Sequence, residues 1–173
     1  MAGLSLAPSP NRKTVRVYMF VLSQCLTSDA VRVGLVASNK KSLFQQLANL
    51  ATTAHHVDTV AVHDRLLERE RLGSTGFGNG IAIPHGKIAG LNRVIGICVR
   101  LAAPIDFDAI DDLPVDLVFM LISPLDGGAD HLKALATVSR MMRDQPFVEK
   151  LRGATNDDAL LALLTSYDQT AKV

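Results

Sequence analysis

Apolar and polar residues alternate along the chain in patterns that predict both strands and helices. Residues 31–36 form a short apolar run typical of a buried strand. Residues 43–54 carry apolar side chains at i, i+4 and i+7, which places them on one face of a helix. A second helix is predicted from about residue 59 to residue 72, where Gly73 supplies a stop. The first half of the chain is therefore a strand followed by two helices.

The second half begins with strands and ends with helices. Apolar runs predict strands at residues 81–83, 94–101 and 115–122. Capping residues followed by helical spacing predict helices that begin near His131, at Pro146 and at Ala159. Grouped elements of this kind imply an α/β fold (α+β in some schemes), with three layers, α/β/α, around a mixed sheet of about four or five strands.

One domain is expected to hold most of the 173 residues, which are enough for a proper core. We predict a single domain over residues 25–166, a disordered extension over residues 1–24 and a tail over residues 167–173. The apolar run at 17–22 superficially resembles a secretory signal. It is too short, however, and Gln24 stands where a cleavage site needs a small residue.

Charge and composition argue against several classes of function. The net charge is +1, with basic and acidic residues interspersed, whereas nucleic-acid binders usually present a basic face. No apolar run approaches the roughly 18 residues that a membrane span needs. Cys25 and Cys98 set no disulfide framework and fit a reducing cytoplasm. We therefore expect a cytoplasmic protein with no nucleic-acid partner and no membrane insertion.

The candidate chemistry lies between Arg69 and Lys87, in the sequence RERLGSTGFGNGIAIPHGK. A glycine-rich loop at residues 73–80 precedes a short buried strand. Pro84 lacks an amide donor and Gly86 relaxes the backbone, so the strand is expected to stop between them. His85 is thus predicted at the end of a buried strand, opposite a glycine-rich loop.

This stretch closely resembles the phosphorylated-histidine segment of enzyme IIA proteins of the bacterial phosphotransferase system, fructose/mannitol class. The sequence GSTGFGNGIAIPHGK is most similar to the nitrogen-regulatory branch, and the resemblance extends from about Leu26 to Leu164. It implies that His85 accepts a phosphoryl group from a histidine-phosphocarrier protein of the HPr/NPr type, on Nε2 rather than Nδ1. It implies no metal and no small cofactor. Because it begins after residue 18, Met19 is a candidate start beside Met1.

Four further residues complete the predicted site. The resemblance places its active-site arginine at Arg69 and its second histidine at His131. A planar guanidinium suits phosphoryl oxygens, and an imidazole at a helix N-terminus stays neutral and donates one N–H. The hydroxyls of Ser74 and Thr75 are candidate donors from the loop. Taken alone, Arg69 could equally extend its charge to water, and His131 could be a solvated residue of a first helical turn.

Other chemistries fit the sequence less well. The glycine-rich loop lacks the lysine of a nucleotide-binding P-loop and does not open a helix. Ser74 is not in the G-x-S-x-G context of a hydrolase nucleophile. Possible metal ligands with no recognised metal spacing are His55, His56, Asp58 and His63. Acidic residues that fit turns and caps better than acid–base catalysis are Asp111, Asp112, Asp126 and Asp130.

Two functions are compatible with the sequence. In the first, phosphorylation of His85 switches which regulatory target proteins the chain binds, as the resemblance to the nitrogen-regulatory branch implies. In the alternative, the chain is a sugar-specific IIA component that passes phosphate to a IIB protein for sugar uptake. We expect phosphotransfer to be the input and regulation the output.

Overall fold

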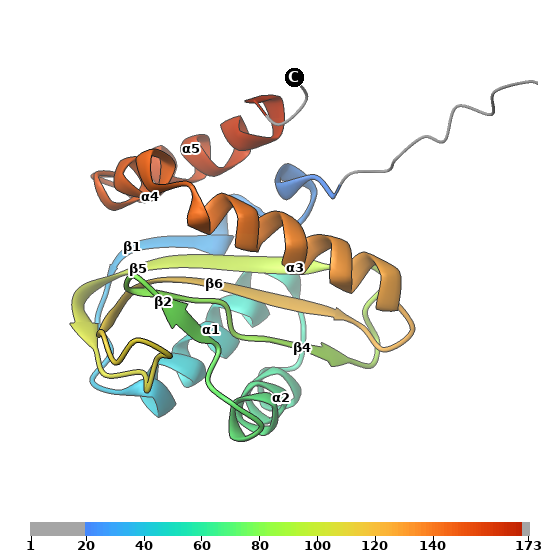
Figure 1. Cartoon of the computed structure of the whole chain (residues 1–173). Helices are drawn as coiled ribbons and strands as arrows, with labels where there is room; N and C mark the ends of the chain where they lie inside the picture. The colour runs from blue at the N-terminus through green and yellow to red at the C-terminus, as the bar shows by residue number, and fades with distance from the viewer. Residues whose placement is uncertain (1–19, 171–173) are drawn as a thin grey trace, which may run out of the picture.

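The computed structural model describes residues 20–170, which form five α-helices and a six-stranded mixed sheet (Figure 1). The strands are β1 (Val31–Leu35), β2 (Gly76–Gly78), β3 (Ile81–Ala82), β4 (His85–Ile88), β5 (Ile95–Ile105) and β6 (Val115–Pro124). The helices are α1 (Lys40–His55), α2 (Thr59–Arg71), α3 (Gly128–Arg143), α4 (Gln145–Arg152) and α5 (Asp157–Thr170).

The sheet is built around the long antiparallel pair β5 and β6. The strand order is β1-β5-β6-β3-β2, and β4 also pairs with β6. Strand β1 runs parallel to β5, while β3 and β4 run parallel to β6 in succession along the same edge. The mixed sheet is as predicted, but it has six strands rather than four or five, because the glycine-rich segment adds β2 and a further strand follows β3.

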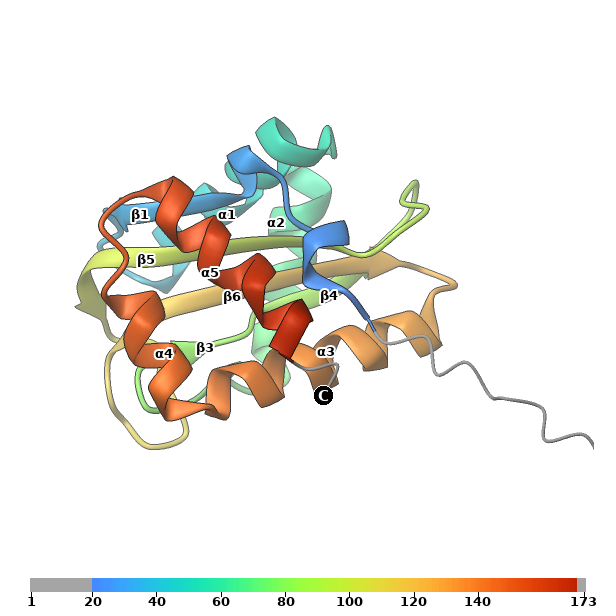
Figure 2. The same cartoon turned by 90° about the horizontal axis from the view of Figure 1, so that it is seen from above.

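Helices cover both faces of the sheet, which confirms the predicted three-layer arrangement. Helices α1 and α2 lie on one face, and α3, α4 and α5 lie on the other (Figures 1 and 2). Side chains cap both helices of the first face, since Asn39 accepts the amide of Ser42 at 2.8 Å in α1 and Asp58 accepts the amide of Val60 at 2.8 Å in α2. Burial on both faces explains why residues 117–122 of β6 are continuously apolar, and all six are fully buried.

The N-terminal end of the described chain packs further into the fold than the sequence predicted. Leu22 begins a short 3-10 turn, Leu22–Gln24, and is fully buried. Its amide donates to Oδ1 of Asp168 at 2.8 Å, and the amide of Ser23 donates to Oδ2 at 2.9 Å. Residues 22–24 are therefore not a disordered extension, and Asp168 belongs to a docked helix rather than a tail. The parts of those two predictions that cover residues 1–19 and 171–173 lie outside the described residues.

Candidate functional site

His85 opens a strand instead of ending one, which corrects the expectation from Pro84. The strand β3 ends at Ala82, and β4 begins at His85, opposite Leu121 of β6. The carbonyl of Pro84 still accepts the Leu121 amide at 3.0 Å, so the chain stays attached to β6 across the proline. A proline lacks the backbone N–H but keeps its carbonyl oxygen. It therefore interrupts a strand without separating it from a neighbouring strand whose amide needs an acceptor.

One ring nitrogen of His85 is fixed by the backbone. Its Nδ1 lies 2.7 Å from the carbonyl oxygen of Ile83. A carbonyl oxygen only accepts, so Nδ1 carries the proton and donates it, and the lone pair of the neutral ring is on Nε2. Burial lowers the pKa of His85, the bond to Ile83 opposes this, and the nearby charge of Arg69 lowers the pKa further. The ring is therefore neutral at pH 7, with a nucleophilic Nε2.

His131 is the second imidazole of the site and lies in the first turn of α3. The centroids of the His85 and His131 rings are 5.7 Å apart, with an interplanar angle of 48°. Only 8% of His131 is exposed, which rules out a solvated first-turn residue. Its Nδ1 lies 2.6 Å from Oγ of Ser123. Burial lowers the pKa of His131 to about 4, and the charges of His85 and Lys87 contribute.

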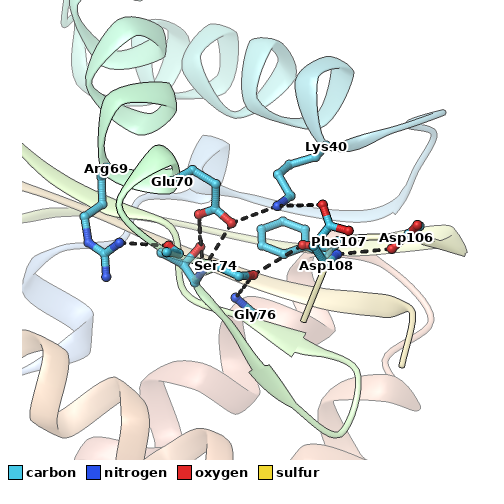
Figure 3. Close-up of polar contacts among 10 residues, drawn as sticks. Lys40, Arg69, Glu70, Ser74, Gly76, Asp106, Phe107 and Asp108 are labelled. Carbon is cyan, nitrogen blue, oxygen red and sulfur yellow. Dashed lines mark hydrogen bonds and ion pairs between the residues drawn. The ribbon is translucent and has the colours of Figure 1, made fainter. Parts of the chain in front are cut away.

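Arg69 lies in the last turn of α2 and reaches toward the glycine-rich loop (Figure 3). Its Nη1 donates to the carbonyl oxygen of Gly73 at 2.9 Å. The guanidinium also lies close enough to His85 to lower the pKa of that ring. The structure thus brings Arg69 to the loop and within electrostatic range of His85, as a role beside His85 requires and as extension of the charge to water alone does not.

Ser74 and Thr75 support the loop itself. The hydroxyl of Thr75 donates to Oε2 of Glu70 at 2.7 Å, and its amide donates to the same carboxylate. The hydroxyl of Ser74 donates to the carbonyl oxygen of Phe107 at 3.3 Å and accepts the amide of Gly76 at 3.2 Å (Figure 3). Both hydroxyl protons are already donated in this conformation. The geometry therefore gives no support to a role for either residue as a hydrogen-bond donor to a phosphoryl group.

Glu70 is the centre of a buried polar network that the sequence did not predict. Its side chain is 8% exposed and accepts from Nζ of Lys40 at 3.0 Å as well as from Thr75. The same ammonium lies 4.5 Å from the centroid of the Phe107 ring (Figure 3). This network ties the glycine-rich loop to α1, α2 and the segment after β5. The only signal in the sequence was a carboxylate directly after Arg69, and its partners are too far along the chain to be inferred.

Neither a metal-binding cluster nor a membrane-spanning helix is found between residues 20 and 170. No group of three or more histidine, cysteine, aspartate or glutamate side chains in that range is placed to hold a metal ion. Among the helices of the same part of the chain, none has the length and apolarity needed to cross a bilayer.

Comparison with known proteins identifies the family. The family model described as phosphoenolpyruvate-dependent sugar phosphotransferase system, EIIA 2, matches residues 24–167. The chain belongs to this family. A nitrogen regulatory protein of Bradyrhizobium diazoefficiens is 41% identical over 150 residues, which are 87% of this chain and 98% of that protein. A nitrogen regulatory protein of Escherichia coli K12 is 38% identical over 150 residues, covering 86% and 92% respectively.

Solved structures agree with this assignment. The nitrogen regulatory protein IIA-Ntr from Neisseria meningitidis superposes with a TM-score of 0.74 at 32% identity, over 82% of this chain and 97% of that one. The mannitol IIA of Escherichia coli shares the fold, with a TM-score of 0.68 at 21% identity over 80% and 98%. Members of the IIA family are phosphotransfer components. The relatives of this chain within the family include nitrogen regulatory proteins.

Proposed function

We propose that this IIA protein accepts a phosphoryl group on Nε2 of His85 from a phosphorylated histidine-phosphocarrier protein of the HPr/NPr type. The phosphorylation state then decides which target proteins it binds. The observation that carries the proposal is the 2.7 Å hydrogen bond from Nδ1 of His85 to the carbonyl oxygen of Ile83. That bond leaves the lone pair of a neutral imidazole on Nε2, which is the form that a histidine nucleophile requires.

The transfer step needs no proton to move. The lone pair on Nε2 of His85 forms the new N–P bond, while the P–N bond to the donor histidine breaks and its electron pair returns to the donor ring. His85 keeps its proton on Nδ1, so its ring gains positive character as the bond forms. The carbonyl oxygen of Ile83, 2.7 Å from Nδ1, stabilises that charge. The phosphorylated donor ring carries a proton on its other nitrogen, so it loses the equivalent positive charge when the P–N bond breaks and leaves as neutral imidazole.

Cationic and N–H groups around His85 suit the incoming phosphate, which brings close to two negative charges. Arg69 supplies a guanidinium from the end of α2, and its contact with Gly73 uses one of its five N–H donors. His131 supplies an imidazole whose ring centroid is 5.7 Å from that of His85. We assign Arg69 to charge stabilisation and His131 to hydrogen bonding of a phosphoryl oxygen.

A regulatory output is the better supported of two outputs. The nitrogen regulatory relatives from B. diazoefficiens and E. coli K12 are 41% and 38% identical, and each aligns along more than nine-tenths of its own length. The alternative, transfer to a IIB protein for sugar uptake, is favoured by a different relative. The fructose-specific EIIA component of Haloferax volcanii is 39% identical over 128 residues, which are 83% of that protein.

Intact-protein mass spectrometry tests the phosphorylation. The protein is incubated with phosphoenolpyruvate, enzyme I and the phosphocarrier, beside His85→Ala and the matched control His63→Ala, which removes a histidine outside the site. We expect an acid-labile gain of one phosphate in the wild type and in His63→Ala, and none in His85→Ala. Phosphate retained by His85→Ala would place the acceptor elsewhere. No gain in the wild type with the phosphocarrier of its own cell would refute phosphoryl acceptance.

A second measurement separates the two outputs. Protein phosphorylated on His85 is mixed with the IIB domain of a fructose or mannitol system, and the phosphate on both proteins is followed with time. Regulation as the output predicts little transfer, together with phosphorylation-dependent retention of partner proteins from the same cell. Rapid, complete transfer to the IIB domain would favour the sugar-specific alternative.

A further inference from the structure

We propose that Ser123 is a positioning residue that holds His131 as its Nε2–H tautomer, so that His131 presents an N–H donor to the phosphoryl group on His85. The role in transfer rests on the proposed function above. The assignment of the tautomer stands on the geometry of Ser123 and His131 alone.

Ser123 is a buried hydroxyl that directly follows the apolar run at residues 117–122 of β6. It lies in β6 and is fully buried, and its neighbours Leu121 and Ile122 are fully buried as well. Its Oγ lies 2.6 Å from Nδ1 of His131, a short distance for a hydrogen bond between two neutral groups. This contact joins β6 to the first turn of α3 through Nδ1 of His131. A polar residue in such a place is normally kept by a specific partner.

The direction of this hydrogen bond follows from the burial of both groups. Among the described residues, His131 is the only hydrogen-bond partner of the Ser123 hydroxyl. If Nδ1 donated to Oγ, the hydroxyl proton would be buried without an acceptor. If the hydroxyl donates to Nδ1, only oxygen lone pairs remain unused, and unused acceptors are tolerated better than unused donors. Ser123 is therefore the donor, and Nδ1 of His131 carries no proton.

His131 must then carry its proton on Nε2. Burial lowers the pKa of His131 to about 4, so the ring is neutral at pH 7 and has one N–H and one lone pair. With the lone pair of Nδ1 occupied by Ser123, the N–H is on Nε2. The opposite tautomer would present a lone pair to the phosphoryl oxygens, which repels them instead of binding them.

The two histidines are thus fixed in opposite tautomers by two different partners. The carbonyl oxygen of Ile83 accepts from Nδ1 of His85, which leaves a lone pair on Nε2. The hydroxyl of Ser123 donates to Nδ1 of His131, which leaves an N–H on Nε2. His85 becomes the nucleophile and His131 becomes the hydrogen-bond donor, although both are neutral imidazoles with ring centroids 5.7 Å apart.

NMR spectroscopy of the ¹⁵N-labelled protein reads the tautomer directly. Two-bond ¹H–¹⁵N correlations at pH 7.5 distinguish Nδ1–H from Nε2–H for each histidine. The measurement is made on the wild type, on Ser123→Ala, and on Ser123→Thr, which keeps the hydroxyl. Ile122→Val is the matched control, because it trims the core at the next residue of β6 and leaves the hydroxyl in place.

We expect Nε2–H for His131 in the wild type, in Ser123→Thr and in Ile122→Val. Ser123→Ala should shift His131 toward a mixture that contains Nδ1–H, while His85 keeps its Nδ1–H. A wild-type His131 protonated on Nδ1 would overturn the proposal whether or not any variant folds. An unchanged tautomer in folded Ser123→Ala would overturn it as well.

Phosphoryl transfer provides the functional readout. Ser123→Ala should slow phosphorylation of His85 by the phosphocarrier on the order of tenfold, as loss of an orienting partner typically does, and Ser123→Thr should restore the rate. Equal rates in Ser123→Ala and the wild type would overturn the role in transfer. A wild type that takes no phosphate would instead refute the proposed function, and the NMR measurement would still decide the tautomer.

Discussion

The rings of His85 and His131 lie with their centroids 5.7 Å apart, although nearly a third of the described chain separates them and they come from a strand and a helix. At this distance the charge on one ring raises the cost of charging the other. Burial is the main cause that lowers the pKa of both histidines, and the charge of His85 lowers the pKa of His131 further. The site therefore holds two neutral imidazoles at pH 7, and a low pH disturbs it because the rings then become protonated.

Acid should destabilise the fold through His131. Its pKa falls from 6.5 to about 4 on folding. Between these values the unfolded chain binds a proton that the folded protein does not. The stability contributed by neutral His131 is therefore fully present above about pH 6.5 and decreases as the pH drops toward 4. The shift corresponds to at most about 3 kcal/mol. Urea unfolding from pH 7.5 to pH 4.5 measures the decrease.

His131→Asn should reduce the pH dependence without removing it. The pKa values of His55 and His85 are also lowered, so these two histidines act in the same direction. Val60→Ala, at an exposed position with no titratable group, is the control and should keep the wild-type slope. If His131→Asn and the wild type lose stability in parallel on acidification, the buried neutral state of His131 is not the cause.

Arg69→Lys should slow phosphoryl transfer to His85 strongly while leaving the fold stable. Lysine keeps the positive charge but loses the planar fork that binds two phosphoryl oxygens at once. We expect a rate loss on the order of tenfold, since one charge-assisted hydrogen bond contributes about 1.5–3 kcal/mol. Arg71→Lys, an exposed position two residues along α2, is the control. A wild-type rate in Arg69→Lys would remove Arg69 from the phosphoryl contacts.

Glu70→Gln should destabilise the glycine-rich loop. The carboxylate is 8% exposed and holds both the ammonium of Lys40 and the hydroxyl of Thr75. A neutral amide removes the nearer and more buried counter-charge of the ammonium and leaves only Asp108, 3.7 Å away and 86% exposed, which should cost about 2 kcal/mol in the free energy of unfolding. Glu68→Gln removes a carboxylate that is 64% exposed, where an ion pair contributes at most about 1 kcal/mol. Equal effects of the two substitutions in urea would contradict a central role for Glu70.

Gly80→Ala should be more harmful than Gly34→Ala, although both glycines have a positive φ, +77° and +80°. A Cβ at Gly34 meets open space, so only the backbone strain of roughly 1 kcal/mol applies. A Cβ at Gly80 would lie 2.7 Å from Nη2 of Arg152, which donates to Asp116 at 2.9 Å. Thermal unfolding of both variants compares the two costs, and a smaller loss at Gly80 would mean that Arg152 moves aside freely.

The sequence predicted the layers of the fold because burial imposes a period on each element. The helical spacing from Leu43 to Ala54 matches the buried face of α1, and the apolar run at 115–122 lies within β6. The number of strands was wrong for a local reason. In the sequence, Pro84 indicates only the loss of a backbone N–H. It does not show that the Pro84 carbonyl still accepts the Leu121 amide, which lets β4 begin at His85.

Site residues divide in the same way. The resemblance to the IIA family pointed to His85, Arg69 and His131. The structure brings these three residues to one site. Glu70 and Ser123 were missed because their importance lies in partners that only folding supplies. Ser123 did leave a signal, since a serine follows directly on the apolar run of β6 and precedes His131 by eight positions. A polar residue in a fully buried strand position requires a partner, and that requirement could have been stated from the sequence.

The contact between Asp168 and the amides of Leu22 and Ser23 has a consequence for synthesis of the protein. It joins positions that are 146 and 145 residues apart, so the first described turn acquires its acceptor only after residue 168 has been made. Such distant contacts form late, because a long loop must close first. A chain truncated before residue 168 would therefore leave the amides of Leu22 and Ser23 without this acceptor during synthesis.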